Sequence, residues 1–137
     1  MTVQLDTASR NAMGAALITE LGTNALVRVY SGAVPANVAA SLGAAVQLGE
    51  LACSSTFALA PSGGVITANA ITQDSAADAT GTASFFRVLT SGGTPKWQGT
   101  CGGTAQSTVG DLQLNSTAIV VGGPIAVTAL ALTMPGA

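Results

Sequence analysis

Asp74 and Asp78 form the closest acidic pair in the sequence and are its candidates for acid–base or metal chemistry. Four residues apart in the segment TQDSAADATG, they could hold a cation or act as paired acids. Serine and threonine are abundant, but activating a hydroxyl requires a base, and the chain contains no histidine. A solvated loop with Asx turns is the commoner explanation of such a pair. We therefore expect no catalytic residue, metal site or cofactor, and predict that the protein is not an enzyme.

Trp97 is the single tryptophan and suggests a different chemistry, the stacking of an aromatic ring on a sugar. One hypothesis is thus a small carbohydrate-binding or hydrolytic domain with Trp97 as the platform and Asp74 or Asp78 as the acid. The competing interpretation places Trp97 in the core of the domain.

Cys53 and Cys101 are the two cysteines, which permit one disulfide but form no metal motif. Their favoured interpretation is a pair of small buried thiols in a protein made in a reducing cytoplasm. A bridge between them is the alternative.

One helix is predicted over 6–22, ahead of all the strands. Asp6 or Thr7 can cap it, apolar residues recur in it at i, i+4 spacing, and Gly22 is placed to stop it. Gly14 inside this helix predicts close packing against another backbone.

Short β-branched and apolar runs bounded by Gly, Pro, Asn, Asp or Ser fill 25–134. Segment 38–55 is ambiguous, since its first half could be a short helix and its second half a strand from Val46 to Cys53. Seven or eight strands at this spacing predict a mainly β fold, an antiparallel β-sandwich or jelly roll, in a single domain over 1–137. The runs from which these seven or eight strands are drawn are ALVRVY, the 46–53 segment, TFALA, GGVITANAIT, ASFFRVLT, PKWQGTC, GDLQLNS, TAIVV and PIAVTALALTM.

The run ASFFRVLT poses a packing problem, because successive side chains leave a strand on opposite faces. Phe85 and Phe86 therefore cannot share one single-sided core, and one of them needs a second cover. The turn SGGTP and the strand KWQGTC complete a predicted hairpin. Phe85 with Arg87 combines an apolar body and a charged anchor, which is typical of protein interfaces. The residues assigned to the core are Phe86, Val88, Trp97 and Cys101.

The last strand poses the same problem, because Leu130, Leu132 and Met134 line one face while Ile125, Val127 and Ala129 line the other. It too must be covered twice, by the facing sheet and by the helix or a neighbouring subunit. The predicted protein interface comprises Phe85, Arg87, Leu130, Leu132 and Met134.

Charge is scarce, with four basic and six acidic residues scattered singly and a net charge of −2. Nucleic-acid binding and adhesion to anionic membranes need clustered Lys or Arg, so neither partner is expected. The GGP at 122–124 interrupts the apolar carboxyl end, which argues against a membrane anchor, and the amino end lacks the pattern of an export signal. Only 7% of residues are charged, against about 25% in typical soluble domains, so we interpret the chain as part of a larger assembly.

Several stretches together resemble a family of known proteins: LDTASRNAMGAALITELG leading into LVRVYSGAVPAN, then DATGTASFFRV, WQGT and the closing DLQLNSTAIVVGGPIAVTALALTMPGA. This order is similar to that of the small capsid cement, or decoration, proteins of tailed bacteriophages, among them jelly-roll proteins of the kind found on a short-tailed Bordetella phage. The resemblance covers most of the chain and is weakest from 41 to 70. It rests on turn and strand patterns, so it transfers no individual functional residue.

The resemblance implies a structural virion protein on the outer surface of the capsid, made in the cytoplasm of a host bacterium. Its expected partners are the phage major capsid protein and a second copy of itself in a homodimer. Such a protein bridges neighbouring shell subunits and so resists the pressure of packaged DNA. A tail or fibre-associated virion protein of the same β class is the alternative.

Overall fold

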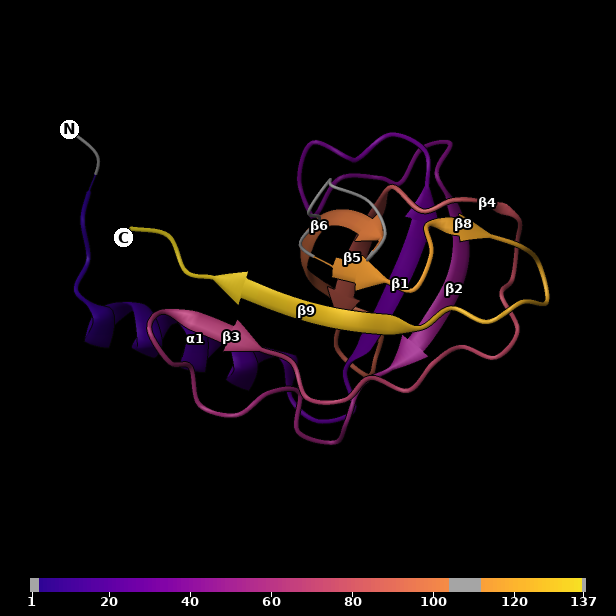
Figure 1. Ribbon diagram of the computed structural model, residues 1–137. Coiled ribbons are helices and arrows are strands. Elements are labelled where there is room, and N and C mark those ends of the chain that lie inside the picture. Colours follow the sequence, from indigo (N-terminus) through magenta and orange to yellow (C-terminus); the bar gives the residue numbers. More distant parts are fainter. Residues whose placement is uncertain (1–2, 104–111, 137) are drawn as a thin grey trace.

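The described chain begins with one helix, and every later regular element in it is a strand (Figure 1). The computed structural model describes residues 3–103 and 112–136. Within these ranges, no helix combines the length and the hydropathy that a bilayer crossing requires. The mainly β fold with one amino-terminal helix confirms the predicted fold class. The elements are α1 (Thr7–Leu21), β1 (Leu26–Ser31), β2 (Val46–Ala52), β3 (Val65–Thr67), β4 (Gly81–Thr82), β5 (Phe85–Leu89), β6 (Pro95–Gly103), β7 (Leu112–Leu114), β8 (Ala118–Ile119) and β9 (Val127–Thr133).

Helix α1 begins and ends where the sequence predicts. The Asp6 carboxylate caps it by accepting a hydrogen bond from the Ser9 amide at 2.8 Å. Gly22 ends it with a φ of 70°, a conformation that favours glycine. A Cβ added to Gly14 would lie 2.8 Å from Cγ of Pro61. The close packing predicted from Gly14 is therefore confirmed, although its neighbour is a proline ring rather than a backbone.

Seven strands form one sheet in the order β2-β1-β5-β6-β7-β9-β3, and β4 pairs with β8 in a separate ribbon. The pairs are antiparallel except for β6 and β7, which run parallel. The expectation of a wholly antiparallel sheet is thus wrong at one pair, where Cys101 lies opposite Leu112 and Gly103 opposite Leu114.

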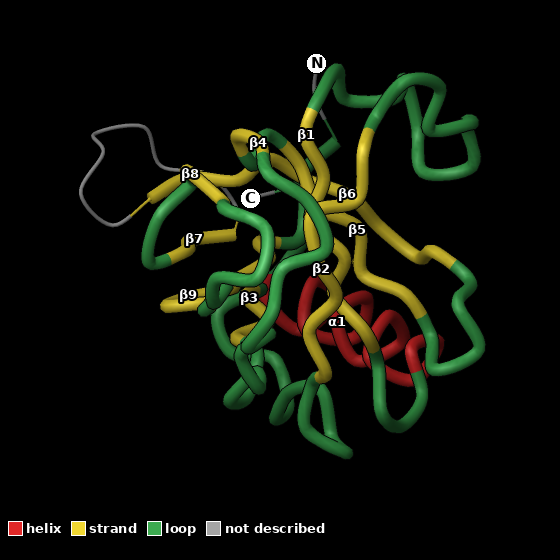
Figure 2. The backbone as a smooth tube through the Cα atoms, turned by 90° about the vertical axis from the view of Figure 1, so that its right-hand side faces the viewer, coloured by secondary structure: helices red, strands yellow, loops and turns green. Residues whose placement is uncertain are grey.

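The sheet curls so that its two halves enclose one hydrophobic core, which gives the molecule its β-sandwich form. Strands β1, β2 and β5 supply one wall of this core, and β3, β7 and β9 supply the facing wall. Figure 2 looks from the side of β4 and β8, with α1 behind the strands. Fully buried members of this main core include Val27, Leu48, Phe86, Ile66, Leu112 and Leu114.

Segment 68–78 closes the sandwich between the edge of β2 and the chain that leads into β9. The Thr72 amide donates a hydrogen bond to the Ala52 carbonyl at 2.9 Å. Asp74 and Ile125 exchange two backbone hydrogen bonds, of 2.9 and 2.8 Å. A sheet edge covered in this way is protected from pairing with another chain.

The opposite end of the molecule, which we call the helix end, consists of α1, β3 and the last residues of β9. The buried guanidinium of Arg10 donates hydrogen bonds from Nε and Nη2 to the Met134 carbonyl, at 3.2 and 3.1 Å. The Leu5 amide donates to the Gly136 carbonyl at 2.7 Å. The segments before α1 and after β9 therefore lie side by side (Figure 1).

The predicted hairpin is present as β5 and β6, with Phe86 opposite Gly99 and Val88 opposite Trp97. Two other expectations differ from the structure. Segment 38–45 forms turns rather than a short helix, and the run TFALA makes only isolated bridges at 56 and 58. Both segments are rich in small residues, whose local propensities are weak compared with tertiary packing.

Candidate functional site

Asp74 lies in segment 68–78, which closes the sandwich. We call its last part, residues 74–78, the clasp. Its Oδ1 accepts a hydrogen bond from the Ala76 amide at 3.0 Å, which is an Asx turn, as expected. Its Oδ2 accepts a hydrogen bond from the Glu50 amide of β2 at 3.3 Å. The Asp74 side chain thus cross-links two backbone segments, and no group of three or more potential metal ligands occurs in the described part of the chain.

The clasp fits against β2 because Gly49 has no side chain. A Cβ at this position would lie 2.5 Å from Oδ2 of Asp74 and 2.6 Å from Cδ1 of Ile125. The carboxylate of Asp78 has a different partner from that of Asp74, because its Oδ2 accepts a hydrogen bond from Nε2 of Gln47 at 3.4 Å. The contacts of the two aspartates favour a structural role over the paired-acid hypothesis.

Trp97 is half-buried and packs against the main core. Its ring meets Phe57 edge-on, with centroids 5.4 Å apart and planes at 77°. The indole Nε1 is buried and has no hydrogen-bond acceptor among the described residues. This environment favours the core interpretation of Trp97 over sugar stacking.

Cys53 and Cys101 are not joined by a disulfide, which agrees with the favoured prediction of two thiols. Cys53 is buried in the main core and Cys101 is half-buried against it. Burial raises the pKa of Cys53 to about 11 because a thiolate would lose its hydration there. Cys53 therefore stays a protonated thiol at neutral pH, a form that is a poor nucleophile.

Phe85 and Arg87, two predicted interface residues, are buried by this chain itself. They point away from the main core, and the ring of Phe85 stacks on that of Tyr30, with centroids 5.0 Å apart and planes at 12°. Phe85 and Tyr30 are absent from the main core cluster, whereas Phe86, on the other face of β5, belongs to it. We call Tyr30 and Phe85 the outer pair.

The loop between β1 and β2, residues 32–45, supplies the second cover that the sequence demanded, and we call it the strap. Arg87 Nη2 donates a hydrogen bond to the Ala40 carbonyl at 2.9 Å, and Arg87 Nε donates to Oε1 of Gln98 at 3.2 Å. Nε2 of Gln98 in turn donates to the Pro35 carbonyl at 2.8 Å. The strap therefore lies over the outer face of β5 and β6, where the sequence predicted a partner.

The other three predicted interface residues, Leu130, Leu132 and Met134, lie on the inner face of β9. Leu130 and Met134 are buried in the main core, and Leu132 is half-buried against it. On the face predicted to need a second cover, Ile125 is buried in the main core and Val127 packs against it, whereas Ala129 is exposed, so this face is covered only in its first part. A partner would reach the interface side chains fully only if the strap or the sandwich opened.

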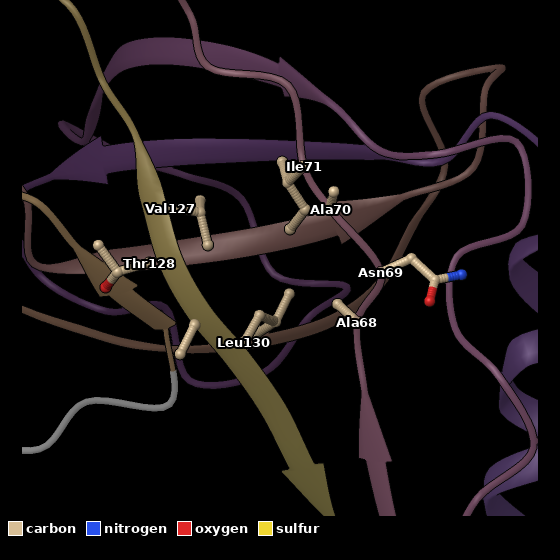
Figure 3. Close-up of a pocket in the computed structure, with 8 residues that line it drawn as sticks. Ala68, Asn69, Ala70, Ile71, Val127, Thr128 and Leu130 are labelled. Atoms are coloured by element: carbon tan, nitrogen blue, oxygen red, sulfur yellow. The ribbon is translucent and has the colours of Figure 1, made fainter.

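A small hollow lies where β3 and β9 part (Figure 3). The ladder pairs Thr67 with Ala131, and the Ala68 amide still donates to the Leu130 carbonyl at 3.0 Å. The hollow is lined by the four residues that follow on each segment in the same register. Its volume of about 110 Å³ suits a few water molecules and lies well below the size of ordinary ligand pockets. The lining residues are Ala68, Asn69, Ala70 and Ile71 opposite Leu130, Ala129, Thr128 and Val127.

Exposed apolar side chains gather at the end of the sandwich away from α1. Val46 pairs with Ser31, and a Cβ on Gly81 would lie 3.3 Å from that of Ser31. The Val121 amide donates to Oγ1 of Thr80, one residue before Gly81, at 2.9 Å. This end, which we call the valine end, carries three exposed side chains: Val46, Val120 and Val121.

The valine end is also poor in charge. The segments 31–46, 79–86 and 112–125, which supply or flank it, contain no Asp, Glu, Lys or Arg. The exposed Asp78 lies at its edge, where its Oδ2 accepts a hydrogen bond from Nε2 of Gln47, the neighbour of Val46. The other large apolar side chains exposed in the described residues, Val3, Met13, Val34 and Leu59, lie outside it. Sequence reasoning missed this surface and the strap, although the charge-free segments and the VV pair at 120–121 were visible signals.

Comparison with known proteins gives no assignment: no family model, curated protein or solved structure matches this chain.

Proposed function

We propose that this protein is a structural virion component that binds the outside of a phage capsid and cements neighbouring major capsid protein subunits against the pressure of packaged DNA. The valine end is the observation that carries the proposal, and it is the surface that we assign to the shell. The sequence resemblance to phage cement proteins agrees with it.

The exposure of Val120 and Val121 gives this surface its apolar character, at 62% and 58%. Burial of apolar area stabilises a contact by about 25 cal/mol per Å², so a contact made by a few valines is weak on its own. A shell repeats its subunits many times, and linked weak contacts add up through multivalency. A contact made mainly by apolar side chains also depends little on the salt concentration.

A lattice contact of this kind needs a rigid module. The clasp holds the segment that carries Val120 and Val121, because the Ala77 amide donates a backbone hydrogen bond to the Gly123 carbonyl at 2.8 Å, and Val46 lies in strand β2, outside the strap. Rigid elements lose little conformational freedom on binding, which favours association.

The test is binding of the purified protein to capsid shells that lack it, measured by co-sedimentation and by cryo-electron microscopy. We expect density at symmetric positions that bridge capsomers, with the valine end toward the shell. Val120→Asp should weaken binding at least about tenfold, since it places a charge in an apolar contact. Leu59→Asp is the matched control, because Leu59 is also exposed, at 74%, but lies outside the valine end.

Unchanged binding of the Val120→Asp protein would reject the assignment of this surface. Bare shells would reject the cement function, and labelling confined to the tail would favour the tail or fibre alternative. Equal losses with both variants would show that the contact does not depend on the valine end.

A further inference from the structure

We propose that the strap opens as a local unit while the sandwich stays folded, and that opening uncovers the outer pair and Arg87. The device changes one face of the protein from small, uncharged residues to aromatic rings beside a guanidinium. The inference concerns the free protein and does not depend on its partner.

The first reason is that the strap can leave without disturbing the main core. Phe85 and Tyr30 lie on the outer face, apart from the core cluster that holds the two halves of the sheet together. The ladder partners of Phe85 in β1 and β6 are backbone partners, which the strap does not provide. Strap opening therefore exposes the outer pair but breaks no strand pairing of the sheet.

The second reason is the way in which the strap is held. Within the strap, the Ala40 amide donates a backbone hydrogen bond to the Asn37 carbonyl, and the Ala45 amide donates one to the Leu42 carbonyl. Side chains of the sheet hold the strap down: Arg87 donates to two strap carbonyls, and Gln98 donates to a third. At the neck of the loop, the hydroxyl of Ser84, just before β5, donates to the Gly32 carbonyl at 2.6 Å. Carbonyls at a surface exchange such donors for water at little net cost.

The third reason is that the two ends of the strap already touch. Ser31 pairs with Val46 at the end of the ladder, so the strap begins and ends at one point. Gly32 has a φ of 102°, and a Cβ there would lie 3.3 Å from Cα of Ala45. A loop whose ends meet is an Ω-loop, which can move as a unit about its neck.

Arg87 is the residue that decides between the closed and open states. Its Nη2 reaches the carbonyls of both Ala40 and Asn37, at 2.9 and 3.4 Å, so one side chain holds the middle of the strap. Its neighbour Arg28 on the same sheet face pairs instead with Glu50, outside the strap. The two arginines thus give a matched pair in which only one is tied to the strap.

Hydroxyl-radical footprinting with mass spectrometry tests the proposal in the full-length protein. Phe57, Phe85 and Tyr30 are all at most 2% exposed, so a closed static structure would protect all three rings equally. We expect Phe85 and Tyr30 to be oxidised several times faster than Phe57. Arg87→Met should raise their oxidation by about tenfold without changing Phe57, while Arg28→Met should leave all three unchanged.

Equal protection of the three rings in the native protein and in the Arg87→Met protein would overturn the proposal. A parallel rise at Phe57 would overturn it as well, because it would show that opening is global unfolding. If Arg87→Met prevents folding, Gln98→Ala replaces it, since this change removes only the tie to Pro35 and the contact with Arg87. Gln98→Ala should raise the oxidation of the outer pair by a smaller factor than Arg87→Met. If the oxidation did not rise, the proposal that the strap opens would again be rejected.

Discussion

The two faces of β5 are buried equally well but by different means. On the inner face, Phe86 and Val88 pack among side chains from both halves of the sandwich. On the outer face, Phe85 is just as inaccessible, yet the segment held over this face by Arg87 and Gln98 is the strap, which has neither helix nor strand. Burial alone therefore does not report stability, because the energy depends on what must be broken to expose a side chain.

Burial of the side chains on the inner face depends on the whole fold. Burial of those on the outer face depends on a single loop and on the few hydrogen-bond donors that hold it. If this distinction is correct, equal substitutions on the two faces will have unequal effects. The predictions below are ordered from the largest expected effect to the smallest.

Phe86→Ala should cost about 3–5 kcal/mol of unfolding free energy, because it leaves a cavity that the rigid main core cannot fill. Phe85→Ala should cost about 1–2 kcal/mol less, since the strap can settle into the space of the missing ring. Urea denaturation followed by circular dichroism measures both. Equal losses would show that the strap is as rigid as the core and would remove the distinction between the faces.

Gly49→Ala tests the seam where the clasp closes the inner core. The added methyl would meet Asp74 and Ile125 at 2.5 and 2.6 Å, so we expect a loss of about 1–3 kcal/mol from overpacking. Gly92→Ala is the control, because its nearest neighbour would be Thr90 Oγ1 at 3.8 Å. The melting temperature of the Gly49→Ala protein should be clearly lower than that of the Gly92→Ala protein. Equal melting temperatures would mean that Asp74 and Ile125 can move aside to admit the methyl group.

The buried thiol of Cys53 should make the free energy of unfolding depend on pH in the alkaline range. Burial raises its folded pKa to about 11, above its unfolded value, so the folded protein keeps the thiol proton longer than the unfolded chain does. This contribution is fully present below the unfolded pKa and is lost as pH rises from about 9 to about 11. Urea titrations at pH 8 and pH 11 should show a decline that is smaller in Cys53→Ala. An identical decline in that variant would mean that water reaches the inner core.

Arg28→Met should change stability least, by under about 1 kcal/mol, although it removes an ion pair on the same face as Arg87. The Arg28 side chain and that of Glu50 are both about one-third exposed, so solvent screens their attraction. The hydrogen bond to Glu50 raises the pKa of Arg28, which stays charged at any ordinary pH. Chemical denaturation at low and high salt measures the effect. A loss matching that of Arg87→Met would show that charge, rather than the tie to the strap, is what the outer face needs.

The elements were largely predictable because their signals are local. The cap at Asp6, the stop at Gly22 and the hairpin turn between β5 and β6 depend on residues within one turn of the chain. The alternation through Phe85 and Phe86 also predicted, correctly, that β5 is covered on both faces.

The identity of the covers was not predictable, since that depends on distant segments. No local pattern says that the loop after β1 folds back over Arg87, or that Asp74 reaches the amide of Glu50. The parallel pairing of β6 with β7 escaped for the same reason. The candidate surface could have been found by plotting charge along the chain, because long uncharged segments meet at the valine end.

The hydrogen bond between Leu5 and Gly136 makes the backbone almost a closed ring. A short linker at that point and a new break within the strap would give a circular permutant that keeps every strand pairing. Its ends would then emerge beside the valine end instead of beside α1. The native order should therefore suit the display of a fused enzyme or epitope away from the proposed shell contact, and the permutant should direct the same cargo into it.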